Sequence, residues 1–228
     1  MTAILLLGGA VAAMLPGLRA ARKAVFQRQR TNNMKQIGLA LRNYNDANRC
    51  LPPATLRDSQ GRLTISWRWR ILPYVEATPF YTYAIGRRWS DAYAFAMLFH
   101  PPYVFFDPAG DAPRSCSETT VLAITGPGTA FDDGQCLPVQ DLDRDTILAI
   151  ECWDSGAYWT EPRDLDIDDI RESIVTGLDG DGLHVLFADG TVWFLNNKVP
   201  LEALKKFFTV EGARRFDREQ VLGPYAFR

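Results

Sequence analysis

The sequence predicts an α+β protein in which a long N-terminal helix precedes a body of short strands and loops. Two observations carry this prediction. A helical pattern broken only by Pro16 runs to about residue 46, and strand-length apolar runs flanked by Gly, Pro and Asp follow Pro53. The chain has 228 residues, 47% of them hydrophobic, which is sufficient for one core plus an appendage. We expect three parts, namely an anchor (1–18), an amphipathic continuation of the helix (19–48) and a globular β-rich domain (49–228).

The first part is predicted to be a membrane anchor. Residues 2–18 contain no charged side chain, and their length is close to the roughly 20 apolar residues that span a bilayer core. A cleaved signal peptide is the alternative, but no basic residue precedes the apolar stretch. We therefore expect a retained helix whose partner is the membrane. The side chains expected to face lipid or the core of an assembly are Ile4, Leu5, Leu6, Leu7, Val11, Leu15 and Leu18.

Residues 19–48 are predicted to continue the helix with one apolar stripe. Met34, Ile37, Leu41 and Tyr44 recur at spacings of three and four, and Pro16 should bend the apolar half relative to this half. Charge is distributed unevenly along the chain. Residues 1–45 carry seven basic and no acidic side chains, so the remaining 18 basic and 27 acidic side chains give the body a charge of −9. A basic arm on an acidic body indicates contact with a membrane surface or a polyanion, and we expect no nucleic-acid partner for the body.

Five further motifs are distributed along the chain. They are TNNMKQIGLALRNYNDANRCLPPA (31–54), SWRWRILPYVE (66–76), TGPGTAF (125–131), WTEPRDLDID (159–168) and HVLFADGTVWFL (184–195). Taken together, they resemble a large bacterial family of unknown function, whose members begin as type IV pilins do and end in a His-x9-Asp-Gly signature. The resemblance implies a pilin-like (pseudopilin-type) fold, with the helix packed on an antiparallel sheet. Three features depart from the family. The prepilin signature is missing, Asp179 replaces the signature His, and Asp107 replaces a Cys.

The charge pattern and the resemblance disagree about orientation. Arg19, Arg22 and Lys23 follow the apolar stretch and, by the positive-inside rule, would leave the body in the cytoplasm. The resemblance places the body outside, in the periplasm or at the cell surface, and we adopt this placement. The cysteines are widely spaced, which argues against zinc and leaves core thiols or up to two disulfides open. They are Cys50, Cys116, Cys136 and Cys152.

Asp189-Gly190 is predicted to be a hairpin turn. The pair separates LHVLFA from TVWFL, and a type I′ turn with two central residues would place Phe187 opposite Val192 and Leu186 opposite Trp193. Both faces of this strand pair carry large apolar side chains. We therefore expect it to be an inner pair that the long helix or another layer covers.

Two acidic segments resemble the start of a calcium loop, because hard cations take closely spaced carboxylates. One contains Asp179 and Asp181 in DGDG, and the other contains Asp141, Asp143 and Asp145 in DLDRDT. Neither segment supplies the bidentate Glu at the twelfth position of such a loop. We expect solvated turns and no cofactor, with calcium as the alternative.

No catalytic constellation is recognisable, because His100 and His184 lack an obvious partner in the sequence, and we expect no enzyme. The loop at 151–162 carries Trp153, Tyr158 and Trp159, which would form a partner surface for a sugar or protein if exposed and would otherwise cover the sheet edge. The predicted function is a non-enzymatic, membrane-anchored pilin- or pseudopilin-like structural subunit of a cell-surface or secretion-type assembly, built from copies of itself or from other pilin-like subunits. The alternative is a non-polymerising, membrane-anchored extracytoplasmic domain that binds a sugar, a protein or calcium.

Overall fold

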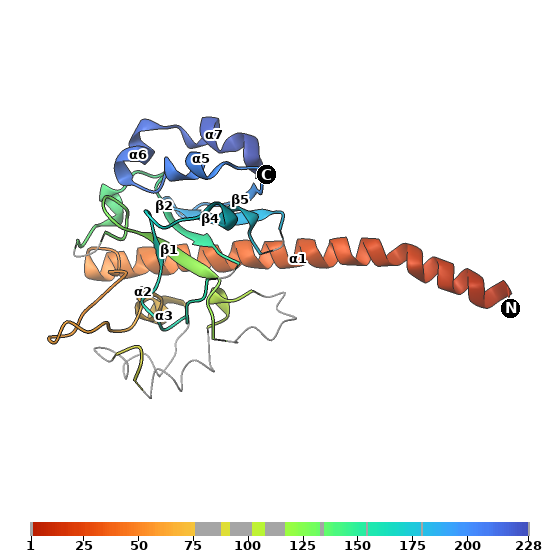
Figure 1. The fold of residues 1–228 in the computed structure, drawn as a ribbon, viewed down its shortest axis with the longest axis horizontal. Helices are drawn as coiled ribbons and strands as arrows, with labels where there is room; N and C mark the ends of the chain where they lie inside the picture. The colour runs from red at the N-terminus through yellow and green to blue at the C-terminus, as the bar shows by residue number, and fades with distance from the viewer. Residues whose placement is uncertain are drawn as a thin grey trace.

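One long helix, α1 (Thr2–Asn48), opens the chain. A computed structural model describes residues 2–75, 88–91, 102–107, 117–132, 135–153, 155–178 and 180–227, without the side chains of residues 2–15. Figure 1 shows that the C-terminal part of α1 runs along the body, whereas its N-terminal part projects away from it. The long N-terminal helix and the α+β class are thus as predicted.

The apolar stripe of α1 that was read from the sequence is buried. Met34, Ile37 and Leu41 are almost completely buried, and Tyr44 is largely so. The helix ends at Asn48, because Arg49 adopts a left-handed conformation (φ 68°) in which its N–H still reaches the carbonyl oxygen of Asn45. The chain then turns back towards the body.

Within the described residues, six strands form one mixed sheet in the order β3-β1-β2-β4-β5-β6. Each pair of adjacent strands from β1 to β6 in this order is antiparallel. The remaining pair, β3 with β1, is parallel. The expected antiparallel sheet is therefore wrong for β3, an edge strand of two residues that the sequence pattern did not reveal. The bounds are β1 (Val121–Thr125), β2 (Ile147–Glu151), β3 (Leu165–Asp166), β4 (Gly182–Phe187), β5 (Val192–Asn196) and β6 (Ala226–Phe227).

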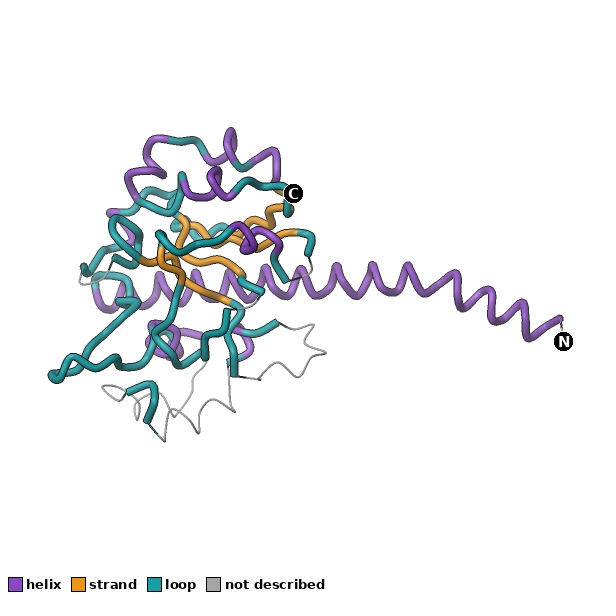
Figure 2. The backbone as a smooth tube through the Cα atoms, viewed as in Figure 1, coloured by secondary structure: helices purple, strands orange, loops and turns teal. Residues whose placement is uncertain are grey.

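The sheet lies between two layers, with α1 on one face and the C-terminal helices on the other (Figures 1 and 2). Alternate residues of β4 point to opposite layers: Leu186 packs in the cluster that contains Met34 and Ile37, whereas Val185 packs with Leu204. Because both faces are covered, β2 and β4 are buried along their whole length. This explains their nearly continuous apolar sequences.

Short helices complete the fold. Two of them have side-chain caps, since Thr209 accepts a hydrogen bond from the Gly212 N–H and Asp217 from the Gln220 N–H. The α-helices are α2 (Trp67–Arg70), α3 (Leu72–Val75), α5 (Leu201–Lys205), α6 (Val210–Arg215) and α7 (Arg218–Val221). The 3-10 helices are η2 (Tyr103–Phe105), η3 (Val139–Asp141), η4 (Glu172–Thr176) and η5 (Gly223–Tyr225).

The loop of the β4–β5 hairpin contains three residues, not the two that the sequence suggested. The Gly190 N–H donates to the Phe187 carbonyl (2.9 Å), and the Phe187 N–H donates to the Thr191 carbonyl (3.0 Å). Gly190 has a positive φ of 83°, whereas Asp189 does not have a positive φ. The predicted type I′ turn is therefore wrong. That turn needs a positive φ at both central residues, whereas in this longer loop only glycine adopts the left-handed conformation.

The longer loop also shifts the register of the hairpin by one residue. Leu186 lies opposite Val192 and Val185 lies opposite Trp193, so the predicted pairing of Leu186 with Trp193 is wrong. The expectation that the pair is an inner one does not depend on this register. It agrees with the layers on both faces of β4.

A disulfide bond joins Cys50, just after α1, to Cys136, with Cα atoms 5.4 Å apart. Two hydrogen bonds lie beside it: the Leu51 N–H donates to the Leu137 carbonyl (2.9 Å), and the Val139 N–H donates to the Asn45 side-chain oxygen (2.9 Å). The C-terminal end of α1 is thus tied to a distant segment of the body. Cys152 is buried in the sheet core, and Cys116 lies outside the described residues.

Candidate functional site

The projecting part of α1 differs from the packed part in burial and in charge. Residues 16–29 are exposed or half-buried, and Arg30 is the first buried side chain after them. Leu18 is 65% exposed and Val25 is 59% exposed. Of the other predicted anchor residues, the side chains of Ile4, Leu5, Leu6, Leu7, Val11 and Leu15 lie outside the described side chains. No helix within the described part of the chain is both long and apolar enough to cross a membrane.

A groove of about 560 Å³ lies between the projecting part of α1 and the edge of the sheet. Its floor contains the rings of Phe194 and Phe227, whose centroids are 5.6 Å apart. Its rim contains Lys23, which forms an ion pair with Asp181. Both partners of this pair are well exposed, so we expect it to stabilise the position of the helix only weakly.

A buried polar cluster joins α1 to the sheet just beyond the groove. The Arg30 guanidinium lies 2.8 Å from an Asp107 carboxylate oxygen and 3.6 Å from a carboxylate oxygen of Glu151. On the neighbouring strand, His184 Nδ1 lies 2.8 Å from the other Glu151 oxygen. Arg30, Glu151 and His184 are each at least 97% buried, so solutes do not reach them and the cluster positions the helix. Asp107 supplies one of its two carboxylates.

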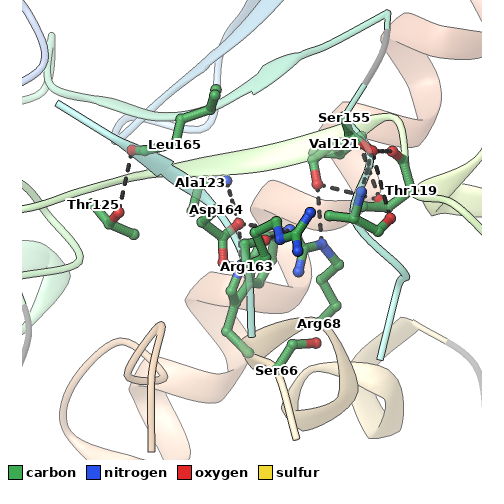
Figure 3. A network of polar contacts seen from close by, with 12 residues as sticks. Ser66, Arg68, Thr119, Val121, Ala123, Thr125, Ser155, Arg163, Asp164 and Leu165 are labelled. Carbon is green, nitrogen blue, oxygen red and sulfur yellow. Dashed lines mark hydrogen bonds and ion pairs between the residues drawn. The ribbon is translucent and has the colours of Figure 1, made fainter. Parts of the chain in front are cut away.

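A second buried pair, Arg68 with Asp164, ties α2 to the sheet (Figure 3). Arg68 Nη2 lies 2.6 Å from Asp164 Oδ1, and Arg68 Nε donates to the Val121 carbonyl (3.0 Å). Asp164 Oδ1 also accepts hydrogen bonds from the Trp67 indole N–H (3.0 Å) and the Ala123 backbone N–H (2.8 Å). Because its donors and acceptors are used internally, the pair holds the fold together and does not face a ligand.

Burial affects the two charges of this pair in opposite directions. It lowers the pKa of Arg68, and the attraction of Asp164 opposes that change. It raises the pKa of Asp164, against the attraction of Arg68 and the hydrogen bonds from Trp67 and Ala123. A buried pair of this kind depends on both partners being present. The motifs SWRWR and WTEPRDLDID each contribute one partner.

The aromatic residues of the 151–162 loop do not form a single surface. Trp159 is 1% exposed and stacks on Trp69, with ring centroids 5.0 Å apart and planes inclined by 9°. It is a core residue, so its assignment to a partner surface is wrong. Trp153 and Tyr158 are 46% and 39% exposed and lie at the surface.

The candidate calcium ligands lie in two places and are engaged in other contacts. Asp145 forms an ion pair with Arg218 (3.2 Å), and an Asp143 carboxylate oxygen accepts a hydrogen bond from the Asp145 N–H (2.9 Å). The carbonyl of Asp141 accepts from Arg214, and Asp181 is paired with Lys23. Asp179 lies outside the described residues. Among the residues that are described, no three His, Cys, Asp or Glu side chains are grouped as they would be to hold a metal ion.

The hairpin turn is held by an arginine that sequence reasoning missed. Arg218 is 5% exposed, lies 4.3 Å from the centroid of the Phe187 ring and binds Asp189 Oδ2 through Nη2 (2.8 Å). Partial burial acts to raise the pKa of Asp189, but the hydrogen bonds from Arg218 and Thr191 outweigh it, so the pKa lies below its usual range. The nearest sequence signal for Arg218 is its place directly after the capping Asp217.

Comparison with known proteins gives one match. A family model described as a protein of unknown function (DUF1559) matches residues 19–101, which include the polar part of α1 and the helices α2 and α3. No curated protein and no solved structure matches the chain. The match agrees with the expected resemblance to a bacterial family of unknown function. Of the two histidines for which the sequence offered no partner, His100 lies outside the described residues and His184 is paired with Glu151 in the buried polar cluster.

Proposed function

We propose that this chain is a non-enzymatic, membrane-anchored, pilin-like structural subunit whose β-rich body lies outside the cytoplasm. The observation that carries the proposal is the division of α1 into a packed and a projecting part. The helix contains 47 residues, which corresponds to about 70 Å at 1.5 Å per residue. Among the side chains that the structure describes, which begin at Pro16, the body buries this helix only from Arg30 onwards.

A helix that leaves its own domain in this way requires a second environment for its first half. Isolated helices are marginally stable in water, and most helical stability in proteins comes from packing. Residues 2–18, which carry no charge, are suited to lipid or to the apolar core of an assembly. Pilin-like subunits use a long N-terminal helix in this manner, and the motifs of this chain resemble theirs.

The disulfide bond supports the location of the body. Disulfides form and persist in oxidising compartments and are rare in the cytosol. The Cys50–Cys136 bond therefore favours the extracytoplasmic placement over the one that the positive-inside rule gives.

The proposal is tested by the intact mass and the N-terminal residue of the native protein, isolated from its own membranes and alkylated without prior reduction. A methylated N-terminus produced by cleavage would support pilin-type processing. A mass without alkylation at Cys50 and Cys136 would support the oxidising location. If the protein were instead recovered from the soluble fraction with all cysteines alkylated, both the anchor and the location would be wrong.

A ligand-binding domain is the second candidate, and the exposure of Trp153 and Tyr158 favours it. Two exposed aromatic side chains five residues apart provide a stacking surface of the kind that sugars and protein partners use. A glycan or peptide array probed with the body and with a Trp153→Ala variant would test it. Binding that disappears in the variant and survives in a Phe216→Ala control, which removes an exposed ring elsewhere, would favour this candidate.

A further inference from the structure

The outward side of α1 concentrates exposed apolar side chains. Eight large apolar or aromatic side chains are strongly exposed in the described part of the chain, and three of them are Leu18, Val25 and Leu39 on this helix. Their spacings of seven and fourteen residues place them nearly on one line along the helix. A fourth, Tyr103, lies beside this line, because its hydroxyl donates to the side chain of Gln36. Half of the exposed apolar groups thus gather on one side of one element.

A basic stripe runs parallel to this apolar line. Arg28, Lys35 and Arg42 are also seven residues apart, and all three are exposed. No acidic residue occurs on α1 before Asp46. At 3.6 residues per turn, the stripe and the apolar line fall within an arc of about 120°. We call this surface the outer face of α1, defined by Leu18, Val25, Arg28, Lys35, Leu39 and Arg42.

We propose that the outer face of α1 lies on a membrane surface and binds anionic lipid headgroups. Helices that combine an apolar line with Lys and Arg lie in the interface plane, with apolar side chains at the acyl boundary and basic side chains among the headgroups. The face of α1 that packs on the acidic body, with Met34, Ile37 and Leu41, is the opposite one, so most of the body is turned away from the negative surface. Arg42 lies at the edge of the outer face and also donates to the Asp189 carbonyl (3.2 Å). This inference rests on the proposed membrane anchor and adds the surface and the lipid class to it.

The arrangement requires a bend between the apolar stretch and the outer face, and Pro16 lies inside α1 at that place. A proline inside a helix removes a hydrogen bond and weakens the helix there. For the first half to enter the bilayer while the second half follows the surface, α1 must bend at Pro16 more sharply than it does in Figure 1. A second copy of the chain fits the outer face less well, because two identical faces would bring their basic stripes together.

The proposal is tested with purified full-length protein and two kinds of vesicle, one of phosphatidylcholine alone and one with a third of phosphatidylglycerol. Flotation measures membrane association. Acetylation by a water-soluble reagent, followed by mass spectrometry, measures the reactivity of Lys35. Lys205 on α5 is the internal control, because that helix covers the opposite face of the sheet.

We expect the protein to float with both vesicles and Lys35 to react more slowly with the anionic ones, while Lys205 does not change. The expected protection is on the order of fivefold, the contribution of one basic side chain near an anionic surface. It should disappear in 0.5 M salt, since exposed charges are screened over about 4–5 Å there. It should also disappear in the double variant Arg28→Gln, Arg42→Gln, but not in the charge-matched control Arg214→Gln, Arg215→Gln.

The outcomes separate this inference from the anchor. Flotation with both vesicles but equal Lys35 reactivity would overturn the outer-face proposal and leave the anchor intact. Flotation only with anionic vesicles, with Lys35 protected, would support the outer face and overturn the anchor. No flotation would overturn both. If Lys35 became protected as the protein concentration rose in the absence of lipid, a second copy of the chain would cover the outer face. The lipid proposal would then be wrong.

Discussion

At the scale of single residues, buried arginines decide how distant parts of this chain are joined. Arg30 links α1 to the carboxylates of Asp107 and Glu151, Arg68 links α2 to Asp164, and Arg218 holds Asp189 in the hairpin loop. Each guanidinium reaches partners from at least two segments, as its several donors allow. Arg218 also pairs with Asp145, which the sequence offered as a calcium ligand.

Asp164→Asn should destabilise the fold strongly. The change leaves Arg68 buried beside a neutral amide, and breaking a buried pair costs about 3–5 kcal/mol. Urea unfolding measures the loss. Asp169→Asn, on the exposed loop nearby, is the matched control and should change the free energy of unfolding by less than about 0.5 kcal/mol. A loss below about 1 kcal/mol for Asp164→Asn would mean that the pair is not formed as described.

The lowered pKa of Asp189 predicts that the free energy of unfolding depends on pH. Its pKa is lowered in the folded state, so its stabilising contribution is complete above the unfolded pKa of about 3.9 and is lost as the pH falls through the folded value. Asp189→Asn should therefore be less stable than the wild type at pH 6, and the difference should shrink towards pH 2.5. Unfolding by urea at both pH values measures this. Glu202→Gln, on an exposed pair, should show no comparable change.

At the scale of elements, the sequence predicted the features that depend on hydrophobic periodicity and on turn residues. The stripe of Met34, Ile37, Leu41 and Tyr44 identified the packed face of α1, and the apolar runs identified β1 and β2. It did not predict β3, because two residues in an acidic loop have no periodicity and form a strand only by pairing with β1. The hairpin was found from Asp189-Gly190, but its register was not, because loop length depends on the conformation of a single glycine.

Gly190→Ala should destabilise the β4–β5 hairpin. A Cβ at this position would meet only Arg42 Nη2 at 3.9 Å, which is an ordinary contact, so the cost arises from the positive φ of 83°. A left-handed conformation costs a residue with a Cβ about 1–2 kcal/mol. Thermal unfolding measures the loss, and Gly190→Asn should recover part of it, since asparagine tolerates this conformation better. Equal losses for both variants would point to a steric cause instead.

At the scale of the whole molecule, a candidate site was harder to predict than the fold. The sequence identified the aromatic loop but could not separate buried Trp159 from exposed Trp153, because both occur in one loop without periodicity. It could not identify the groove or the buried polar cluster, since each brings together residues more than a hundred positions apart. The outer face of α1, in contrast, is a property of one helix and can be read from a spacing of seven.

Removing the disulfide should affect the whole molecule. Cys50→Ser combined with Cys136→Ser opens a loop of 86 residues and should lower the free energy of unfolding by about 2–4 kcal/mol. Reducing agent should lower the melting temperature of the wild type and leave that of the double variant unchanged. A wild-type protein that reductant does not affect would show that the bond does not contribute to stability.

The same bond determines how the molecule bears a mechanical load. A pull on the N-terminal end of α1 passes to the body along the packed part of the helix, from Arg30 to the covalent link at Cys50 that follows Asn48. With the bond intact, the end of the helix stays fastened to the segment around Cys136 even if the packing along α1 shears. Once the bond is reduced, only non-covalent contacts resist the pull. Under load, the oxidised protein therefore keeps α1 covalently attached to the segment around Cys136, whereas in the reduced protein α1 can slide along the body.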